Sequence, residues 1–366
     1  MKAAVCYEFG QPLIVEDVEI EAPQRGEVKV RLAATAICHS DVHLVHGDWS
    51  GGLPVVAGHE SAGIVDEVGE NVTMAAPGDR VVVSLLRSCG RCLPCTTGAT
   101  HHCIGTFALD RESRLRNAAG QALQHGIKTA GFAEYAIVDQ SQVVRIPAGM
   151  PLDRAALLGC GVITGTGAVF NTAAVRVGES VVVIGAGGVG LNTIQGAAIA
   201  GANPIIAVDR VDTKLTAAKA FGASHALDGT NIESKEIVRA VRKLTGRGAD
   251  YVFVTVGSPE AATQGQLMLR PGGTLVVVGI PAIKATVSLR MYDLVWSEQR
   301  VIGSRMGSTR LQADVARLVD HYLRGRLKLD ELISGRYPLE NINDAIASME
   351  RGEALRNVIV FQGDLT

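Results

Sequence analysis

Four cysteines in the first third of the chain are spaced so that they could share one metal ion: Cys89, Cys92, Cys95 and Cys103. Zinc accepts four thiolates tetrahedrally, and short spacings let a single loop wrap the ion. Because four protein ligands leave no open position, the pattern predicts a structural zinc. An iron–sulfur cluster and four metal-free thiols are alternatives, but the polar intervening residues with Gly90 and Gly98 favour zinc. His101 and His102 could compete as ligands, although we expect an exposed pair.

Two of the other three cysteines belong to short motifs. Cys38 opens a Cys-His-Ser-Asp segment, and Cys160 stands between two glycines, while His59 lies in a Gly-His-Glu segment. Spacing alone does not join these three residues, since a lone buried cysteine or a core histidine is common. The odd total of seven cysteines favours metal binding or catalysis over a disulfide framework. Cys6 is expected to be a small core hydrophobe.

A glycine-rich turn follows an apolar run and opens a helical pattern; its residues are Gly185, Gly187, Gly188, Val189 and Gly190. Such a turn lets the backbone approach a pyrophosphate at the helix N-terminus. Alone the pattern is weak, because many turns are rich in glycine. Here Asp209 ends the next predicted strand, about 20 positions further on, where a carboxylate meets the adenosine ribose hydroxyls. We therefore predict NAD, since Asp209 would repel the 2′-phosphate of NADP, although the adjacent Arg210 could help to accept it.

The elements that must position these groups follow two patterns. Up to about residue 160, short valine-rich runs broken by glycine and proline, such as 27–32, 61–68 and 80–85, indicate antiparallel strands. From 162 to 305 strands alternate with helices, and continuously apolar strands predict a parallel sheet covered on both faces. The predicted elements of this second pattern are 180–185, 189–200, 204–209, 213–221, 232–245, 250–256, 261–269, 274–279 and 301–306. Residues 104–130 are interpreted as a surface loop, and 306–366 as a return to the first domain.

Length and charge limit the classes of protein. A chain of 366 residues is expected to form two domains. A formal net charge of −2 provides no large positive field for nucleic acid or an anionic membrane. The N-terminus lacks a signal-peptide pattern, and the uncharged run 180–208 reads as strand, helix and strand rather than a membrane span. We expect a cytoplasmic protein that binds neither nucleic acid nor membranes.

These motifs occur together in the order and approximate spacing of the zinc-dependent medium-chain alcohol dehydrogenases, which the chain resembles over nearly its full length. The resemblance implies a Rossmann domain, a doubly wound parallel α/β sheet, at 162–305. It implies a GroES-like, mainly antiparallel β catalytic domain at 1–161 and 306–366, with a structural zinc lobe at about 88–104. It further implies two zinc ions per subunit, the catalytic one held by Cys38, His59 and Cys160 with water or substrate in the fourth position.

The resemblance also implies roles for single residues. Asp41 would orient the zinc-bound histidine, Glu60 could approach the metal, and Ser40 and His43 would carry the alcohol proton to solvent. Zinc would act as a Lewis acid on an alcohol whose hydride passes reversibly to NAD, giving an aldehyde or ketone. The further coenzyme contacts would be His39, Thr164, Val189, Lys214 and Arg356. Leu85 and Trp49 are candidates for the wall of the substrate pocket, with core packing as the alternative.

Partners and alternative functions stay open at this point. A homodimer that pairs edge strands near 301–306 is expected by analogy, with a tetramer as the alternative. A thiol-dependent formaldehyde dehydrogenase shares the zinc pattern and would need cations for its adduct; the candidates are Arg111, Arg114 and Arg116, unless they form a solvated loop. A non-catalytic nucleotide-binding relative is the alternative from another class, and such proteins usually lose zinc ligands.

Overall fold

The computed structural model describes residues 1–49, 51–230 and 235–361. Its contacts divide the chain into two compact units, Met1–Gly161 with Arg310–Thr366, and Val162–Thr309. Residues 306–309, which we predicted with the terminal segment, lie in the second unit because Asn171 donates to the Gly307 carbonyl. The terminal residues 362–366 of the predicted catalytic domain lie outside the described part of the chain.

The first unit is mainly antiparallel β structure. Within the described residues, one sheet has the order β10-β6-β5-β3-β18-β17 with β9 beside β3, and another has the order β7-β2-β1-β4-β8. The first sheet comprises β3 (Glu27–Ala36), β5 (Glu60–Val68), β6 (Arg80–Val83), β9 (Tyr135–Asp139), β10 (Val143–Arg145), β17 (Ile333–Tyr337) and β18 (Arg356–Val360). The second comprises β1 (Lys2–Cys6), β2 (Ile14–Ile20), β4 (Val55–Val56), β7 (Leu115–Asn117) and β8 (Gln124–His125). The helices are α1 (His39–His46), α2 (Leu93–Thr96), α3 (Leu152–Ala156), α10 (Leu311–Leu323) and α11 (Ile342–Glu350).

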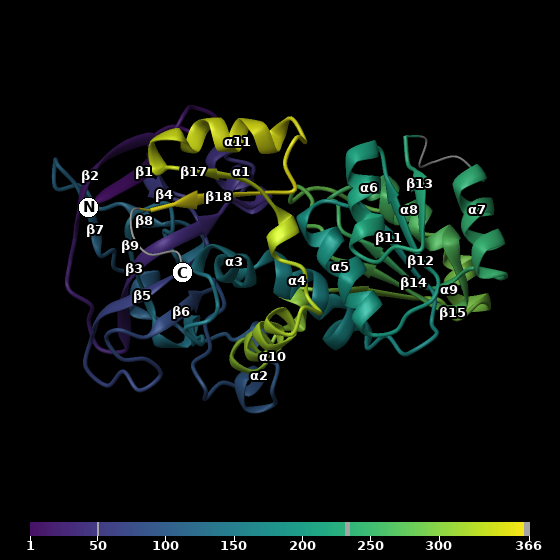
Figure 1. Cartoon of the computed structure of the whole chain (residues 1–366), viewed down its shortest axis with the longest axis horizontal. Coiled ribbons are helices and arrows are strands. Elements are labelled where there is room, and N and C mark those ends of the chain that lie inside the picture. The colour runs from purple at the N-terminus through teal and green to yellow at the C-terminus, as the bar shows by residue number, and fades with distance from the viewer. Residues whose placement is uncertain (50, 231–234, 362–366) are drawn as a thin grey trace. The chain divides into compact units, whose positions relative to one another are not determined.

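The second unit is built around a parallel sheet with the order β13-β12-β11-β14-β15-β16 (Figure 1). Counted along this unit the order is 3-2-1-4-5-6, the doubly wound arrangement of dinucleotide-binding folds. Its strands are β11 (Val181–Ile184), β12 (Ile205–Asp209), β13 (His225–Asp228), β14 (Ala249–Val254), β15 (Leu269–Val277) and β16 (Arg300–Gly303). Its helices are α5 (Gly188–Ile199), α6 (Asp212–Ala220), α7 (Lys235–Thr245), α8 (Pro259–Met268) and α9 (Met291–Trp296), and α4 (Gly161–Gly167) leads into it. Every residue of β11 is buried, as its unbroken apolar run predicts.

Several sequence expectations need correction. The segment 104–130 is not simply a surface loop: it contributes β7 and β8, and Arg114, Leu115 and Leu123 are buried. Burial there is possible because Arg114 donates to both oxygens of the buried Glu27, at 3.0 and 2.9 Å. The strand expected at 301–306 ends at Gly303, and β13 and α9 were not predicted. The helix predicted at 232–245 begins at Lys235, and its first three positions lie outside the described residues.

The run 180–208 forms a strand, a helix and a strand, as expected. Among the described residues no single helix is long and apolar enough to cross a membrane. One bent pair, Leu152–Gly159 with Gly161–Ala173, passes that test by length and composition.

Candidate metal and coenzyme sites

The start of α1 fixes the position of Cys38. The long strand β3 ends at Ala36, and Cys38, with extended backbone, precedes the first helical residue. The Asp41 side chain accepts the backbone N–H of Cys38 at 3.1 Å, so the helix start and the cysteine are held by one carboxylate. Ser40 is half-buried and His39 is exposed on the same helix.

Asp41 also holds His59. Its other carboxylate oxygen accepts the Gly58 N–H at 2.9 Å and lies 2.8 Å from Nδ1 of His59. Both side chains are fully buried. Burial lowers the pKa of His59, but the charges and hydrogen bonds of Asp41 and Cys38 together outweigh it, so the pKa lies well above its usual value. Because Asp41 holds the proton on Nδ1, Nε2 is the nitrogen that could bind a metal ion in place of its own proton, and this buried atom has no hydrogen-bond partner among the described residues.

Four side chains meet at this point: the ligand atoms of Cys38, His59, Glu60 and Cys160 all lie within 4.8 Å of one another, and all four residues are buried. The hydrogen bond between the two thiols lowers the pKa of Cys38 and raises that of Cys160. Two thiols and a free imidazole nitrogen are a donor set that suits zinc. The residues therefore fit the catalytic ion that the sequence predicts.

The glycines beside Cys160 have a steric reason. A Cβ at Gly159 would lie 2.7 Å from the Val83 carbonyl oxygen, and one at Gly161 would overlap the guanidinium of Arg356. The sequence showed this Gly-Cys-Gly motif but not its cause. Only glycine lets the chain pass between β6 and Arg356 closely enough to bring Cys160 to the cluster.

Glu60 and Arg356 form a buried ion pair next to the cluster. Burial raises the pKa of Glu60 to about 7, although the guanidinium of Arg356 opposes that shift. One carboxylate oxygen of Glu60 contacts Arg356, and the other has no hydrogen-bond partner within the residues that the structure describes. We predicted Arg356 as a pyrophosphate contact, and sequence reasoning missed that it would also pair with Glu60. No local signal could have shown it, because the two residues are 296 positions apart.

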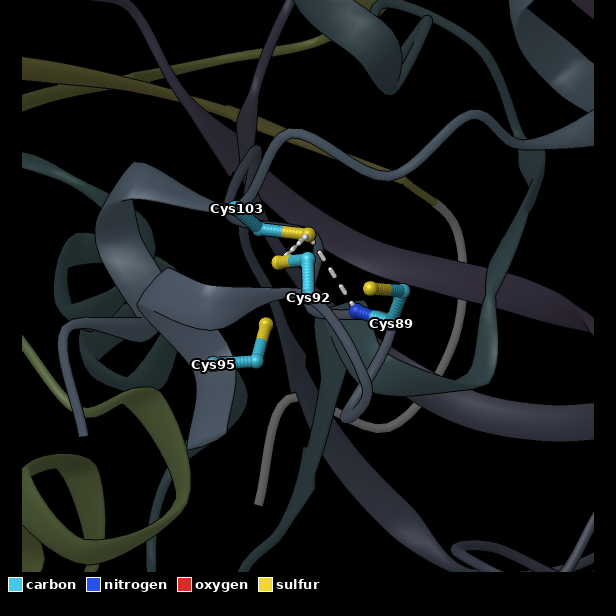
Figure 2. Close-up of side chains that lie close together, drawn as sticks. All are labelled: Cys89, Cys92, Cys95 and Cys103. Carbon is cyan, nitrogen blue, oxygen red and sulfur yellow. Dashed lines mark hydrogen bonds between the residues drawn. The ribbon is translucent and has the colours of Figure 1, made fainter. Parts of the chain in front are cut away.

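The four cysteines of the predicted lobe converge from α2 and the loops on either side. Figure 2 shows their sulfur atoms directed toward a common centre, and these atoms all lie within 4.8 Å of one another. The backbone N–H groups of Cys89 and Gly105 each donate to the sulfur of Cys103 at 3.3 Å. The rings of His101 and His102 are tilted against each other, with centroids 4.1 Å apart and planes at 47°, and neither residue is a member of this group among the described residues. The lobe fits a four-coordinate zinc.

The glycine-rich turn lies between β11 and α5, at the point where the strand order of the second unit reverses. Ligands bind such sheets at the carboxyl ends of the strands at this switch point. Gly185 has a φ of +97°, and a Cβ there would lie 2.6 Å from the side chain of Val256, in the loop that follows the neighbouring strand β14. A Cβ at Gly190 would overlap the carbonyl oxygen of Gly185, whereas Gly187 faces open space. The turn therefore has the close packing and the open backbone that a pyrophosphate site requires.

Asp209 ends β12 beside this turn. One carboxylate oxygen accepts the Ala186 N–H at 2.6 Å, and the other accepts the N–H groups of Arg210 and Val211 at 2.7 and 3.0 Å. The carboxylate is thus fixed next to the turn, where it can meet ribose hydroxyls. Lys214 lies half-buried on α6, and Thr164 on α4 is buried with its hydroxyl 3.6 Å from the sulfur of Met306.

Comparison with known proteins decides the family. Residues 24–148 match the alcohol dehydrogenase GroES-like domain, and residues 188–323 match the zinc-binding dehydrogenase domain. The chain is 38% identical to the NDMA-dependent alcohol dehydrogenase of Amycolatopsis methanolica, over 99% of each protein. The chain belongs to the zinc-dependent medium-chain alcohol dehydrogenases.

Two further comparisons agree. The S-(hydroxymethyl)glutathione dehydrogenase of Saccharomyces cerevisiae is 36% identical over 98% of this chain and 95% of its own length. The crystal structure of an alcohol dehydrogenase zinc-binding domain protein from Burkholderia ambifaria superposes with a TM-score of 0.94, at 37% identity over 99% of each chain. This alcohol dehydrogenase is therefore an enzyme that uses zinc and NAD, as the sequence predicted, and the non-catalytic alternative is wrong.

Proposed function

We propose that this dehydrogenase holds its catalytic zinc on Cys38, His59 and Cys160, and its structural zinc on Cys89, Cys92, Cys95 and Cys103. The observation that carries the proposal is the buried Nε2 of His59, which has no hydrogen-bond partner in the described part of the chain and lies within 4.8 Å of both thiol sulfurs. The free oxygen of Glu60 belongs to the same group. Glu60 could therefore approach the ion, and the remaining position would accept the substrate oxygen.

The chain's own residues would bind the coenzyme, orient the ligands and carry the proton. When bound in a site with an open position, zinc acts as a Lewis acid that makes an alcohol more acidic. Asp41 keeps the His59 ring in one tautomer, and Ser40 and His43 would pass the alcohol proton to solvent as hydride leaves for NAD. The proposed coenzyme contacts are His39, Thr164, Gly185, Gly187, Gly188, Val189, Gly190, Asp209, Arg210, Lys214 and Arg356. We propose the unit Met1–Gly161 with Arg310–Thr366 as the catalytic domain, and the unit Val162–Thr309 as the coenzyme domain.

Substitution of one cysteine from each group tests the assignment. Cys38→Ser should abolish NADH formation and lower zinc from two ions per subunit toward one, while the fold persists. Cys95→Ser should also remove one zinc but lower the melting temperature, because lobe folding depends on its metal. Cys6→Ser is the matched control, with both zinc ions retained. Normal rates for Cys38→Ser would overturn the proposal.

A simple alcohol is the substrate class that we favour over a thiol adduct, which the yeast relative's name describes for that protein. The cations proposed for an adduct are largely engaged: Arg114 is buried with Glu27, and Arg116 lies 3.2 Å from Glu21. A panel of primary, secondary, aromatic and polyol substrates should give NADH without added thiol. If NADH formed only when glutathione or mycothiol was added with formaldehyde, the thiol adduct would be favoured as the substrate instead.

We further propose a homodimer formed along β16 in a cytoplasmic enzyme. Support for the dimer comes from large apolar side chains exposed near this edge strand, which include Met291, Tyr292, Val295 and Trp296. Sedimentation of the purified enzyme tests it, and a tetramer is the alternative outcome.

A further inference from the structure

The end of α1 carries a histidine–carboxylate pair that the metal and coenzyme sites do not use. Nδ1 of His43 lies 2.7 Å from a carboxylate oxygen of Asp48, just beyond the helix. His43 is 36% exposed and Asp48 is 48% exposed, so the pair borders on solvent. Both residues lie in the first unit, on a single continuous segment.

The helix end itself brings the two side chains together. Gly47 has a φ of +79°, its N–H donates to the Leu44 carbonyl, and the N–H of Asp48 donates back to the carbonyl of His43. These two bonds are the Schellman motif, which reverses the chain over the last helical turn. Residue 48 must therefore lie beside residue 43. The Trp49 ring then stacks on the imidazole, with centroids 5.5 Å apart and planes at 29°.

We infer that Asp48 is a positioning residue for His43, and that it sets which nitrogen of His43 accepts the proton leaving the alcohol. The inference rests on the proposed role of His43. A carboxylate at Nδ1 favours the tautomer with hydrogen on that atom, which leaves Nε2 as the proton acceptor. Nε2 gains the alcohol proton as hydride goes to NAD, and the resulting imidazolium gives one proton to water. The carboxylate of Asp48 faces the ring while the imidazole carries the proton.

Other titratable groups lie on α1 and on the segments packed against it. The helix carries a second pair of the same kind: Nε2 of His46 lies 3.2 Å from Glu350 of α11, and these side chains are 45% and 38% exposed. That pair has similar chemistry and exposure but no assigned role, which makes it a matched control. Further charged or titratable groups on these elements include Cys6, Glu8, His39, Asp41, Lys128 and Asp344.

The test uses Asp48→Asn, which keeps a hydrogen-bond acceptor but removes the charge. Single-turnover NADH formation is followed against pH with the best alcohol of the panel above. Exposed ion pairs of this kind change an equilibrium constant by about two- to fivefold. We therefore expect a loss of about that size in the rate near neutral pH. Asp48→Glu should restore part of the rate, and Glu350→Gln should leave the profile unchanged.

A double-mutant cycle separates positioning from a structural effect. In a His43→Gln background, Asp48→Asn should have no further effect on rate or profile. An equal effect in both backgrounds, or an equal loss of rate from Glu350→Gln, would overturn the inference. If instead His43→Gln itself left the rate unchanged, the proposed proton path would fail rather than the positioning of His43 by Asp48.

Discussion

Replacing Asp41 by asparagine tests how far one buried carboxylate organises the catalytic metal site. The carboxylate receives the N–H groups of Cys38 and Gly58 and Nδ1 of His59, at 3.1, 2.9 and 2.8 Å. An asparagine has one acceptor oxygen. If that oxygen keeps Gly58 and His59, the amide NH₂ faces the N–H of Cys38, and two donors oppose each other in a fully buried site.

The magnitude follows from these contacts. A buried donor without a partner costs about 1–3 kcal/mol of folding free energy. Removing the carboxylate that orients a zinc-bound histidine lowers metal affinity by about 10- to 100-fold, or about 1.4–2.8 kcal/mol. We therefore expect Asp41→Asn to be less stable and to lose the catalytic zinc selectively. Dialysis against a weak chelator followed by metal analysis should leave about one zinc per subunit, with NADH binding retained.

The control is another carboxylate that is fully buried in the same unit. Asp153 of α3 pairs with Arg154 and Arg336 at 2.9 and 2.8 Å. Asp153→Asn should also destabilise the enzyme but keep both zinc ions. If Asp41→Asn bound two zinc ions with wild-type affinity, the argument that this carboxylate organises the metal site would be refuted.

Three further predictions concern the rest of the fold. Gly190→Ala should abolish saturable NADH binding in a fluorescence titration without changing zinc content, because the Cβ of the alanine would overlap the carbonyl oxygen of Gly185. Retained NADH binding would contradict this packing argument. Arg114→Met should lower the free energy of unfolding in denaturant by about 3–5 kcal/mol, since Glu27 would stay buried without its partner, and adding Glu27→Gln should recover part of the loss. Burial lowers the pKa of His125 from 6.5 to about 4. Between these two pH values the unfolded chain binds more protons, so the free energy of unfolding falls as the pH drops through this interval. His125→Gln should flatten this dependence of the unfolding free energy on pH, and an unchanged slope would exclude His125 as its source.

The sequence predicted what short motifs can encode. The glycine-rich turn needs a strand before it and a helix after it, and β11 and α5 supply both. The four-cysteine lobe needs one wrapping loop, and its spacing shows that loop directly. In each case the interacting groups are close in sequence, so residue types and spacing were sufficient.

The sequence did not predict groups whose burial depends on distant partners. Arg114 belongs to a polar segment that reads as a solvated loop, yet it is buried because Glu27 of β3 neutralises it. The strand β13 was missed because none of its residues is fully buried, so it lacks the apolar run by which the other strands were identified. Both failures have one cause, namely that the environment of a polar residue is set by tertiary contacts.

The metal site of the first unit combines both situations, and its buried charges can be accounted for in three sets. The carboxylate of Asp41 is satisfied by three nitrogen donors, and the charges of Glu60 and Arg356 compensate each other. The third set comprises the thiols of Cys38 and Cys160 with the imidazole of His59, and two buried thiolates would be strongly unfavourable without compensating positive charge. A divalent ion held by both sulfurs and Nε2 of His59 would compensate the two thiolates and would replace the proton that otherwise charges the imidazole. Local motifs supplied the ligands, but this balance also needs Arg356, which lies 296 positions from Glu60.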